Sequence, residues 1–533
     1  MGTRGKTRRP PRRHHTIGAL GLALLLAGCS TDSAEDEPPV PHQTFISRPD
    51  LKPAELKFTQ GPAWEDTYAT AEEYVLLTPN FDTETPSSAA TILDAAGNIV
   101  WMDPSGEHDD DAGHFDLRVQ EYRGEPVLTY FKGPAAGGWG YGDIYLMDSS
   151  YQVFTTVTTG GSLPPHSTDF HDMTITDDDT MLVLAYVAAP ADLSALGGPE
   201  AGWVHDAVVQ EIDIETGQVT FEWSALDHVP VTDTMLDFDE ELQRQQDRLD
   251  EGDEHAKDGE LGTRDNPYDY FHINSATVDH DGGLLLSARH THAVYKIDRD
   301  TGALDWILGG TASDFTMDDD AVFAWQHAAA RDDDGTLVLL DNHARNADDD
   351  QSSRGLRLTL DEEAMTASVH TEYRPPAERP AGSMANLQLL ENGNVVIGWG
   401  QQPFFSEYTR DGELIYDVCH GAACHGGDDG GGSYRAYKAA WEGHPTTQPR
   451  VVIQENASDD RHVYVSWNGA TEVAQWRLLA GADEASATEQ VTVDKESFET
   501  SLPLSTDSDY VAVEALDSDG HVLATGVATA DSR

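Results

Sequence analysis

From residue 74 to residue 416 the sequence repeats one kind of unit. An apolar run, a turn rich in Asp, Asn and Gly, and a second apolar run alternate with strands that carry Asp-x-x-Thr-Gly and end in Trp. Examples are ATILDAAGNIVW (90–101), VVQEIDIETGQVTFEW (208–223), INSATVDHDGGLLLSA (273–288) and LQLLENGNVVIGWG (387–400). Recurrence at about fifty residues, with four strands each, is typical of propeller blades. The pattern predicts an all-β fold built on a six-bladed β-propeller, because a β-sandwich does not easily use so many equal hairpins in one core.

Two segments depart from this pattern. Residues 236–252, LDFDEELQRQQDRLDEG, place apolar and charged residues at helical spacing, which predicts a helical insertion that acts as a lid or a packing element. After residue 445 the strands VVIQENASDDRHVYVSWNG, EVAQWRLLAG and SDYVAVEALDSDGHVLATGVA indicate a separate small β-sandwich of fibronectin or immunoglobulin type. We therefore expect the propeller over 46–445 and the C-terminal β-sandwich over 446–533.

The N-terminus predicts export. Six basic residues within positions 4–13 precede a short apolar stretch, 17–27, and then Leu26-Ala27-Gly28-Cys29. This stretch is too short for a membrane span and has the layout of a signal peptide over 1–28. The last four residues are similar to a bacterial lipobox, so we expect Cys29 to be lipidated; a plain signal peptide with a chance cysteine is the alternative. Residues 29–45 follow as an acidic, Pro-containing tether.

The net charge of the chain disfavours anionic macromolecules as partners. The chain has 95 acidic and 33 basic residues, a net charge of −62. Such a field repels nucleic acid and anionic membrane, so we expect no nucleic-acid partner and no membrane contact beyond the lipid anchor. It suits a solvated surface in salty surroundings, outside the cytoplasm at the cell surface or in the periplasm. Structural Ca²⁺ is an option at Asp-rich turns, which are otherwise simply solvated; these are 177–179, 318–320 and 332–334.

Cysteine usage agrees with export. Besides Cys29 the chain has only Cys419 and Cys424, in VCHGAACHGG, and a small disulfide-closed loop is the favoured interpretation. Haem attachment would require C-x-x-C-H, which this segment lacks. Metal binding by Cys419, His420, Cys424 and His425 is a weaker alternative.

Several common enzyme motifs are absent. The sequence has no G-x-x-x-x-G-K-[ST], no G-x-G-x-x-G between strand and helix, no G-x-S-x-G and no H-E-x-x-H. What remains is a set of histidines at the starts of blade strands: His171, His272 and His327. Corresponding ends of successive blades converge on a propeller's central channel, so these residues can share one pocket.

Three imidazoles together with Arg289 would suit a tetrahedral oxyanion. A guanidinium binds two of its oxygens, imidazole N–H groups bind others, and a neutral imidazole can attack. Taken singly, each histidine has a plainer explanation as a structural hydrogen-bonding group, and Arg289 as a partner in an ion pair. His290, His292 and His343 are expected in the wall around the site. Most aromatic residues of a propeller belong to blade cores, but some could stack on a phenolic ring. The candidates for such stacking are Trp139, Tyr141, Trp325, Trp399 and Phe404.

The sequence resembles the arylsulfotransferase family of six-bladed propeller enzymes, which move a sulfuryl group without a nucleotide donor. The resemblance runs from residue 44 to beyond residue 476, nearly the whole mature chain. The segments that carry it include STDFHDMTIT (167–176), FHINSATVDHDGGLLLSARHTHAVYKIDRDTGALDWILGG (271–310), WQH with GTLVLLDNHA (325–344), and SYRAYKAAWEGHP (433–445).

The resemblance implies a ping-pong reaction between an aryl sulfate donor and a phenolic acceptor through a sulfohistidine. His327 corresponds to the family's nucleophile, His272 and Arg289 to side chains that hold the sulfuryl oxygens, and His171 to an assisting histidine. No cofactor is implied. One departure concerns the residues after the nucleophile: an acidic residue and an arginine commonly follow Gln-His, whereas this chain has Ala328 to Ala330 and then Arg331. Losing a carboxylate there would affect the tautomer and nucleophilicity of His327.

Two other functions are open on the sequence. A propeller without chemistry would bind a sulfated or phenolic ligand, or a partner protein, at the cell surface. A metal-dependent hydrolase at the histidine cluster would be inhibited by chelators and use water as its only acceptor.

Overall fold

The computed structural model describes residues 42–70, 73–79, 89–103, 113–136, 138–251, 259–345, 351–421, 424, 431–455, 461–505 and 508–528. The predicted signal peptide (1–28), Cys29, and all but the last residues of the predicted tether lie outside this range. His425 does so too. No helix among the described residues is long and apolar enough to cross a membrane.

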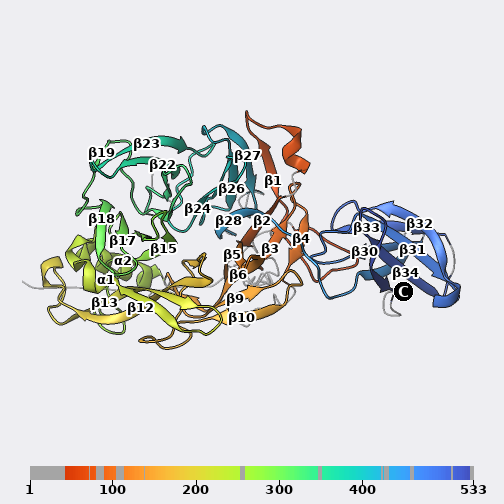
Figure 1. Ribbon diagram of the computed structural model, residues 1–533, viewed down its shortest axis with the longest axis horizontal. Helices are drawn as coiled ribbons and strands as arrows, with labels where there is room; N and C mark the ends of the chain where they lie inside the picture. Colours follow the sequence, from red (N-terminus) through yellow and green to blue (C-terminus); the bar gives the residue numbers. More distant parts are fainter. Residues whose placement is uncertain are drawn as a thin grey trace, which may run out of the picture. The chain divides into compact units, whose positions relative to one another are not determined.

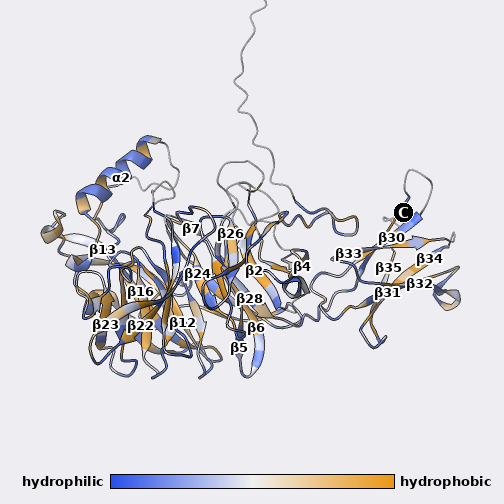
Figure 2. Ribbon diagram, turned by 90° about the horizontal axis from the view of Figure 1, so that it is seen from above, coloured by the Kyte–Doolittle hydropathy of each residue, from blue (hydrophilic) through white to orange (hydrophobic). Residues whose placement is uncertain are grey.

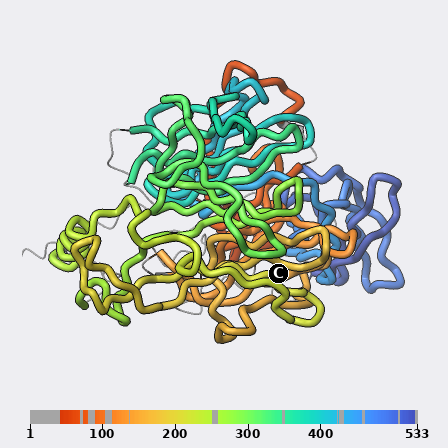
Figure 3. The backbone as a smooth tube through the Cα atoms, turned by 60° about the vertical axis from the view of Figure 1, so that its left-hand side comes forward, coloured from red at the N-terminus to blue at the C-terminus, as the bar shows by residue number. Residues whose placement is uncertain are grey.

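Six four-stranded antiparallel blades surround a common centre (Figure 1). The backbone passes through them in order, from orange through yellow and green to teal (Figure 3). Blade two comprises β5 (Gly113–Tyr122), β6 (Glu125–Gly133), β9 (Asp143–Met147) and β10 (Val153–Val157). Blade three comprises β11 (Met173–Ile175), β12 (Thr180–Ala191), β13 (Gly202–Asp213) and β14 (Val219–Ser224). Blade four comprises β15 (Ile273–Val278), β16 (Leu284–Ala288), β17 (Ala293–Ile297) and β18 (Leu304–Gly309).

The last two blades each gain a fifth strand. Blade five comprises β20 (His327–Arg331), β21 (Leu337–Asp341), β22 (Arg354–Asp361) and β23 (Thr366–Tyr373), with β19 (Thr316–Met317) added in parallel to β23. Blade six comprises β24 (Asn386–Leu389), β25 (Val395–Gly398), β26 (Phe404–Tyr408) and β27 (Leu414–Cys419), with β1 (Lys57–Gln60) on its outer edge. A two-stranded ribbon, β7 (Ala135–Ala136) and β8 (Trp139–Gly140), projects from blade two. The predicted six-bladed propeller is confirmed.

Blade one closes the ring from both ends of the domain. Its inner strand β28 (Ser433–Ala440) pairs with β2 (Glu73–Pro79), which continues to β3 (Thr91–Leu93) and β4 (Ile99–Met102). Radial repetition of the blades leaves only short, protected sheet edges. Because every blade packs between two others, inner strands are buried on both faces; all five residues of β16 are buried.

The Asp-x-x-Thr-Gly turns are stabilised by hydrogen bonds within each turn. Asp298 accepts hydrogen bonds from the backbone N–H and hydroxyl of Thr301, and Gly302 adopts φ +74°, a conformation that favours glycine. Asp213, Thr216 and Gly217 repeat this arrangement one blade earlier. The Asp-x-x-Thr-Gly motif therefore encodes the turn itself.

The predicted insertion forms helix α2 (Phe238–Glu251), preceded by the short helix α1 (Ala225–His228). Figure 2 shows α2 as a mostly hydrophilic helix set off from the blade strands. Its first residue, Phe238, is buried against Tyr268 with ring centroids 5.2 Å apart. Other helices in the described part of the chain are short 3₁₀ helices: η1 (Asp66–Thr70), η2 (Ser194–Leu196), η3 (Val231–Asp233) and η5 (Glu484–Ser486).

The C-terminal region has two antiparallel sheets around its own apolar core. One contains β29 (Arg450–Glu455), β30 (Arg461–Ser466) and β33 (Glu499–Leu504); the other contains β32 (Thr488–Asp494), β31 (Gln475–Gly481), β34 (Tyr510–Leu516) and β35 (Val522–Val527). Buried Val463 and Leu502 from the first sheet and Trp476 and Val513 from the second share this core. Its assignment to the fibronectin or immunoglobulin type stays a prediction.

Candidate functional site

His171 lies at the entry to β11, where a buried carboxylate fixes its ring. Asp169, two residues earlier and fully buried, accepts a hydrogen bond from His171 Nδ1 and also from the backbone N–H groups of His171 and Gly140. These contacts hold the Asp169 carboxylate in place, and Asp169 in turn fixes the ring of His171 through Nδ1.

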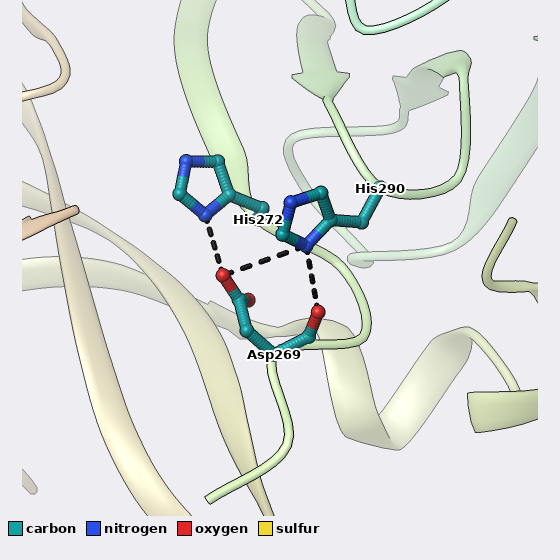
Figure 4. A group of neighbouring side chains, drawn as sticks. All are labelled: Asp269, His272 and His290. Carbon is teal, nitrogen blue, oxygen red and sulfur yellow. Dashed lines mark hydrogen bonds and ion pairs between the residues drawn. The ribbon is translucent and has the colours of Figure 1, made fainter. Parts of the chain in front are cut away.

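His272 is held in the same way at the entry to β15 (Figure 4). Its Nδ1 lies 2.5 Å from Oδ2 of Asp269, and its backbone adopts φ +53°. His290 lies beside it, with ring centroids 4.6 Å apart. The Nδ1 of His290 donates to the backbone carbonyl of Asp269 at 2.6 Å, and its Nε2 accepts from Arg289 Nη1 at 2.8 Å. His290 is thus a direct neighbour of two candidate residues and not a distant wall residue.

His327 opens β20 and is 2% exposed. Its Nδ1 lies 2.7 Å from Oδ1 of Asn342 and 3.1 Å from the carbonyl oxygen of Trp325. Trp325 and Ala328, on either side, both adopt positive φ, at +58° and +56°. Strained backbone of this kind collects at functional sites, where the surrounding structure enforces it.

The alanines after His327 lie in a β-bulge between β20 and β21. Ala329 is fully buried, and its backbone N–H and carbonyl bond to Ser275 and Thr277 of β15. Arg331 pairs with Asp279 and Glu362 outside the histidine cluster. The partner of His327 is therefore not an acidic residue that directly follows it but an amide fifteen positions later.

Arg289 lies in the β16–β17 turn and is 8% exposed. Besides His290, its guanidinium donates to the carbonyl of Gly382 at 2.8 Å and lies 4.8 Å from the ring centroid of Trp325. Burial, together with Arg244 of α2, lowers the pKa of Arg289 to about 10, so it stays charged at neutral pH. Arg345 lies over the same indole, at 5.2 Å, and pairs with Glu241 of α2.

The four predicted residues converge. The rings of His171 and His272 are 4.9 Å apart and nearly perpendicular. The pKa of His327 is lowered well below its usual value, mainly by burial and next by the charge of Arg289. His171 and His272 lower it further. Burial and the neighbouring His171, Arg289 and His205 do the same for the pKa of His272, even though Asp269 contacts it. The imidazoles of His272 and His327 are therefore neutral at neutral pH and lie near one buried cation, Arg289.

A buried ion network lies next to the histidines at the ring's centre. Arg435 of β28 donates to the backbone carbonyls of His171 and Asn274 and to the carboxylate of Asp172. Arg118 of β5 binds the same carboxylate at 2.7 Å. These bonds join four blades, so the strand ends that carry the site share one rigid support.

The site also contains three groups with the spacing of a metal site: Asp269, His272 and His290. Their hydrogen bonds argue against that use. One nitrogen of His290 carries a hydrogen for a carbonyl, and the other accepts from a guanidinium that would repel a cation. No other such cluster occurs among the residues that the structure describes.

The other residues singled out from the sequence are the two cysteines, His292, His343 and the Asp-rich turns. Cys419 and Cys424 form a disulfide, which excludes the alternative in which both are metal-bound thiolates. His292 packs edge-on against Trp325, 4.4 Å between centroids, and His343 pairs with Asp341 away from the cluster. Asp332 and Asp334 bind Arg357 and Arg410, which makes that turn an ion-pair network. Ca²⁺ at the other two turns stays a prediction.

Sequence reasoning missed the groups that orient the rings. Asp169 and Asp269 precede their histidines by two and three residues, so an Asp just upstream of each His was an available signal. Asn342 lies in LLDNHA, beside the His343 that sequence analysis placed in the wall. Nothing local connects Asn342 to His327, because they lie on different strands.

The family model for arylsulfotransferase (ASST) matches residues 118–421, more than half of the chain. The chain belongs to this family. The match covers all four converging residues, and family membership indicates an aryl sulfotransferase activity. No curated protein matches the sequence.

Solved structures offer only remote likeness. A protein of unknown function from Bacteroides caccae is 11% identical, with 69% of this chain and 99% of that chain covered and a TM-score of 0.38. Virginiamycin B lyase from Staphylococcus aureus, in an inactive variant with quinupristin, is 12% identical over 76% and 93%, with a TM-score of 0.30. The β-propeller domain of Cps50 (Swd1) from Myceliophteria thermophila is 11% identical over 58% and 90%, with a TM-score of 0.29.

Proposed function

We propose that this protein transfers a sulfuryl group from an aryl sulfate to a phenol, without a nucleotide donor, through a sulfohistidine at His327. One observation carries the proposal. Three imidazoles are held through Nδ1 by fixed oxygen atoms near a buried guanidinium, and the amide of Asn342 leaves the lone pair of His327 on Nε2. Nucleophilic attack needs such a lone pair, and a sulfuryl group needs a fixed cation for its oxygens.

The reaction divides into two displacements. In the first, the Nε2 lone pair of His327 attacks sulfur, the sulfur–oxygen bond to the aryl group breaks, and the phenolate leaves with the bonding electrons and takes up a proton. In the second, the oxygen of an acceptor phenol attacks sulfur, the nitrogen–sulfur bond breaks, and its electron pair returns to Nε2. His171 and His272 are suited to exchange the phenolic proton, since each is backed by a carboxylate.

Arg289 supplies the charge that the net field of the protein does not. Its pKa of about 10 keeps it cationic, and its hydrogen bonds to His290 and Gly382 hold it in place. At a few ångströms a fixed cation outweighs a distant, screened acidic surface. We propose that this charge replaces any metal or organic cofactor in the reaction.

The test uses the full-length purified protein with 4-nitrophenyl sulfate as donor and a phenol as acceptor. We expect nitrophenol release that depends on the acceptor, a sulfated acceptor, and a sulfuryl adduct on His327 by peptide mass spectrometry. His327→Ala should abolish the adduct and lower kcat by at least about 1,000-fold, as for loss of a covalent nucleophile. His166→Ala is the control, since the His166 side chain is exposed and pairs with Asp143.

Other outcomes would contradict the proposal in distinct ways. Folded protein that binds the aryl sulfate without turnover or adduct would be a ligand-binding propeller. Activity that a chelator abolishes, with water as the only acceptor, would identify metal-dependent hydrolysis.

We also propose that the protein works outside the cytoplasm, anchored through lipidated Cys29. The disulfide between Cys419 and Cys424 supports this, because such bonds persist in oxidising compartments. Incorporation of a labelled fatty acid by the native protein, lost in Cys29→Ser, is the expected result; equal labelling of both would contradict it.

A further inference from the structure

Asn342 has one orientation available to it. The residue follows β21 and is 0% exposed. Its amide nitrogen donates to the carbonyl oxygens of Ala381 and Met384, at 2.8 and 3.1 Å. Because those two acceptors take both amide hydrogens, the oxygen Oδ1 must face His327.

This orientation fixes the tautomer of His327. An amide oxygen only accepts, so Nδ1 of His327 must carry the hydrogen in the 2.7 Å contact. The carbonyl of Trp325, at 3.1 Å from the same nitrogen, adds a second acceptor. The lone pair of His327 is thereby confined to Nε2.

The partner of His327 differs in charge from the partners of its neighbours. Asp169 and Asp269 back His171 and His272 with carboxylates, whereas a neutral amide backs His327. A carboxylate at Nδ1 stabilises a positively charged ring much more than an amide does. The structure thus separates two imidazoles that contact a carboxylate from one that contacts a neutral amide.

This difference matters for a sulfohistidine. When Nε2 of His327 bonds to sulfur while Nδ1 keeps its hydrogen, the ring becomes positive and the sulfuryl group carries the negative charge. A carboxylate beside Nδ1 would stabilise that ring and slow the second displacement, in which the nitrogen–sulfur bond breaks and neutral imidazole leaves. An amide holds the ring's position and tautomer without this stabilisation.

We propose that Asn342 is a positioning residue that orients His327 and, by being uncharged, keeps the sulfuryl group on it readily transferable. The inference rests on the proposed sulfohistidine reaction. In hydrolases with a Ser-His-Asp triad a carboxylate orients the histidine; here a neutral amide has that role. A neutral partner suits a sulfohistidine, because the sulfuryl group must then be transferred to the acceptor.

The test compares Asn342→Asp with Asn342→Ala and with the native full-length protein. Rapid mixing with 4-nitrophenyl sulfate gives a burst of nitrophenol as His327 is sulfonated, followed by turnover limited by transfer. We expect Asn342→Asp to prolong the adduct's lifetime about tenfold, equivalent to about 1.4 kcal/mol, with a fuller burst and a lower kcat. Asn342→Ala should slow both steps by a similar factor and not prolong the adduct selectively.

A second readout follows from the same charge. The acid limb of kcat/KM should move to higher pH in Asn342→Asp, because the new carboxylate favours the protonated imidazole. The groups that otherwise act on His327 are Arg289 in the β16–β17 turn, His171 before β11 and His272 before β15, and both variants retain them. A purely structural role for Asn342 would lower activity without moving this limb.

In Asn342→Asp, carboxylate oxygens would face two carbonyls, so a measurement on the native protein guards against misfolding of the variant. Histidine labelled with ¹⁵N should show His327, assigned by its loss in His327→Ala, with hydrogen on Nδ1 and none on Nε2. Hydrogen on Nε2, or a folded Asn342→Asp with unchanged adduct lifetime, would overturn the inference alone. A native protein without adduct or transfer would instead overturn the proposed function, and this inference with it.

Discussion

Burial and hydrogen bonding, acting together, set the chemistry of the individual histidines. Burial is the first cause of the lowered pKa values of His272, His290 and His327, and the nearby Arg289 adds to it. A neutral imidazole is a nucleophile or a proton acceptor, whereas an imidazolium is neither. Burial of the cluster around one cation therefore keeps His272, His290 and His327 neutral at neutral pH.

The same burial makes the fold sensitive to acid. The pKa values of His292 and His420 are lowered to about 4 because of burial, whereas an exposed histidine titrates near 6.5. Below pH 6.5 the unfolded chain therefore takes up protons that the folded chain does not, so the free energy of unfolding falls as pH drops from 6.5 towards 4. Each of these two residues should cost about 3 kcal/mol by pH 4.

Urea denaturation between about pH 8 and pH 4.5 measures this loss. His292→Gln should flatten the pH dependence, whereas Val322→Ala, at an exposed position without a titratable group, should leave it unchanged. A free energy of unfolding that stays constant down to pH 5 would contradict the assignment of buried, neutral histidines.

Sequence reasoning predicted the candidate site residues but not the groups that orient them. His171, His272, Arg289 and His327 were predicted at strand ends, and the structure brings them together. The acceptors at Nδ1 were not predicted, because an imidazole's tautomer depends on atoms brought to it by folding. Asn342 illustrates this: its amide is oriented by carbonyls from residues 381 and 384, about forty positions further along the chain.

At the scale of strands, the repeated unit was sufficient to predict the blades but not their closure. The repeated unit at 273–288, for example, is observed as the paired strands β15 and β16. The pairing of β28 with β2 joins segments more than 350 residues apart, and no local pattern encodes it. The added outer strands β1 and β19 were missed for the same reason.

Amide side chains also join neighbouring blades through their inner strands. Asn386 of β24 donates to the carbonyl of Ala436 on β28 and accepts from its N–H, at 2.9 and 3.0 Å. Gln388 makes the same pair of bonds to Lys438. The amides thereby extend hydrogen bonding from the sixth blade to the strand that closes the ring.

This arrangement predicts a graded loss of stability. Asn386 is 1% exposed, so Asn386→Ala removes two bonds and leaves a buried N–H and carbonyl without partners, at a cost of about 2–4 kcal/mol. Gln388→Ala is the matched control. It breaks the same kind of pair where the side chain is only partly buried, so water can replace it at a cost of about 1 kcal/mol. Equal costs for the two variants, by chemical denaturation, would contradict a special role for burial at the closing strand.

At the scale of the molecule, composition predicted an acidic surface that excludes nucleic acid, and only the fold explains how an anionic donor is then accommodated. The net charge of −62 belongs to a chain with few basic residues, yet Arg289, Arg118 and Arg435 are drawn into the centre of the ring. Short-range attraction at the site and long-range repulsion from the surface therefore oppose each other. The sequence alone does not predict which of these two electrostatic effects is larger, because that depends on which charges are buried.

Salt separates these two contributions. The Debye length falls from about 30 Å at about 10 mM salt to about 3 Å at 1 M, so salt screens the distant acidic surface long before it screens contacts inside the buried site. We therefore expect kcat/KM for the anionic aryl sulfate to rise about tenfold across this range, while kcat/KM for a neutral phenol acceptor at saturating donor changes little. The difference between the two substrates serves as the internal control, because a general effect of salt on folding would alter both. A decrease in kcat/KM for the aryl sulfate would mean that the buried arginines, and not the acidic surface, set the field that an approaching donor meets.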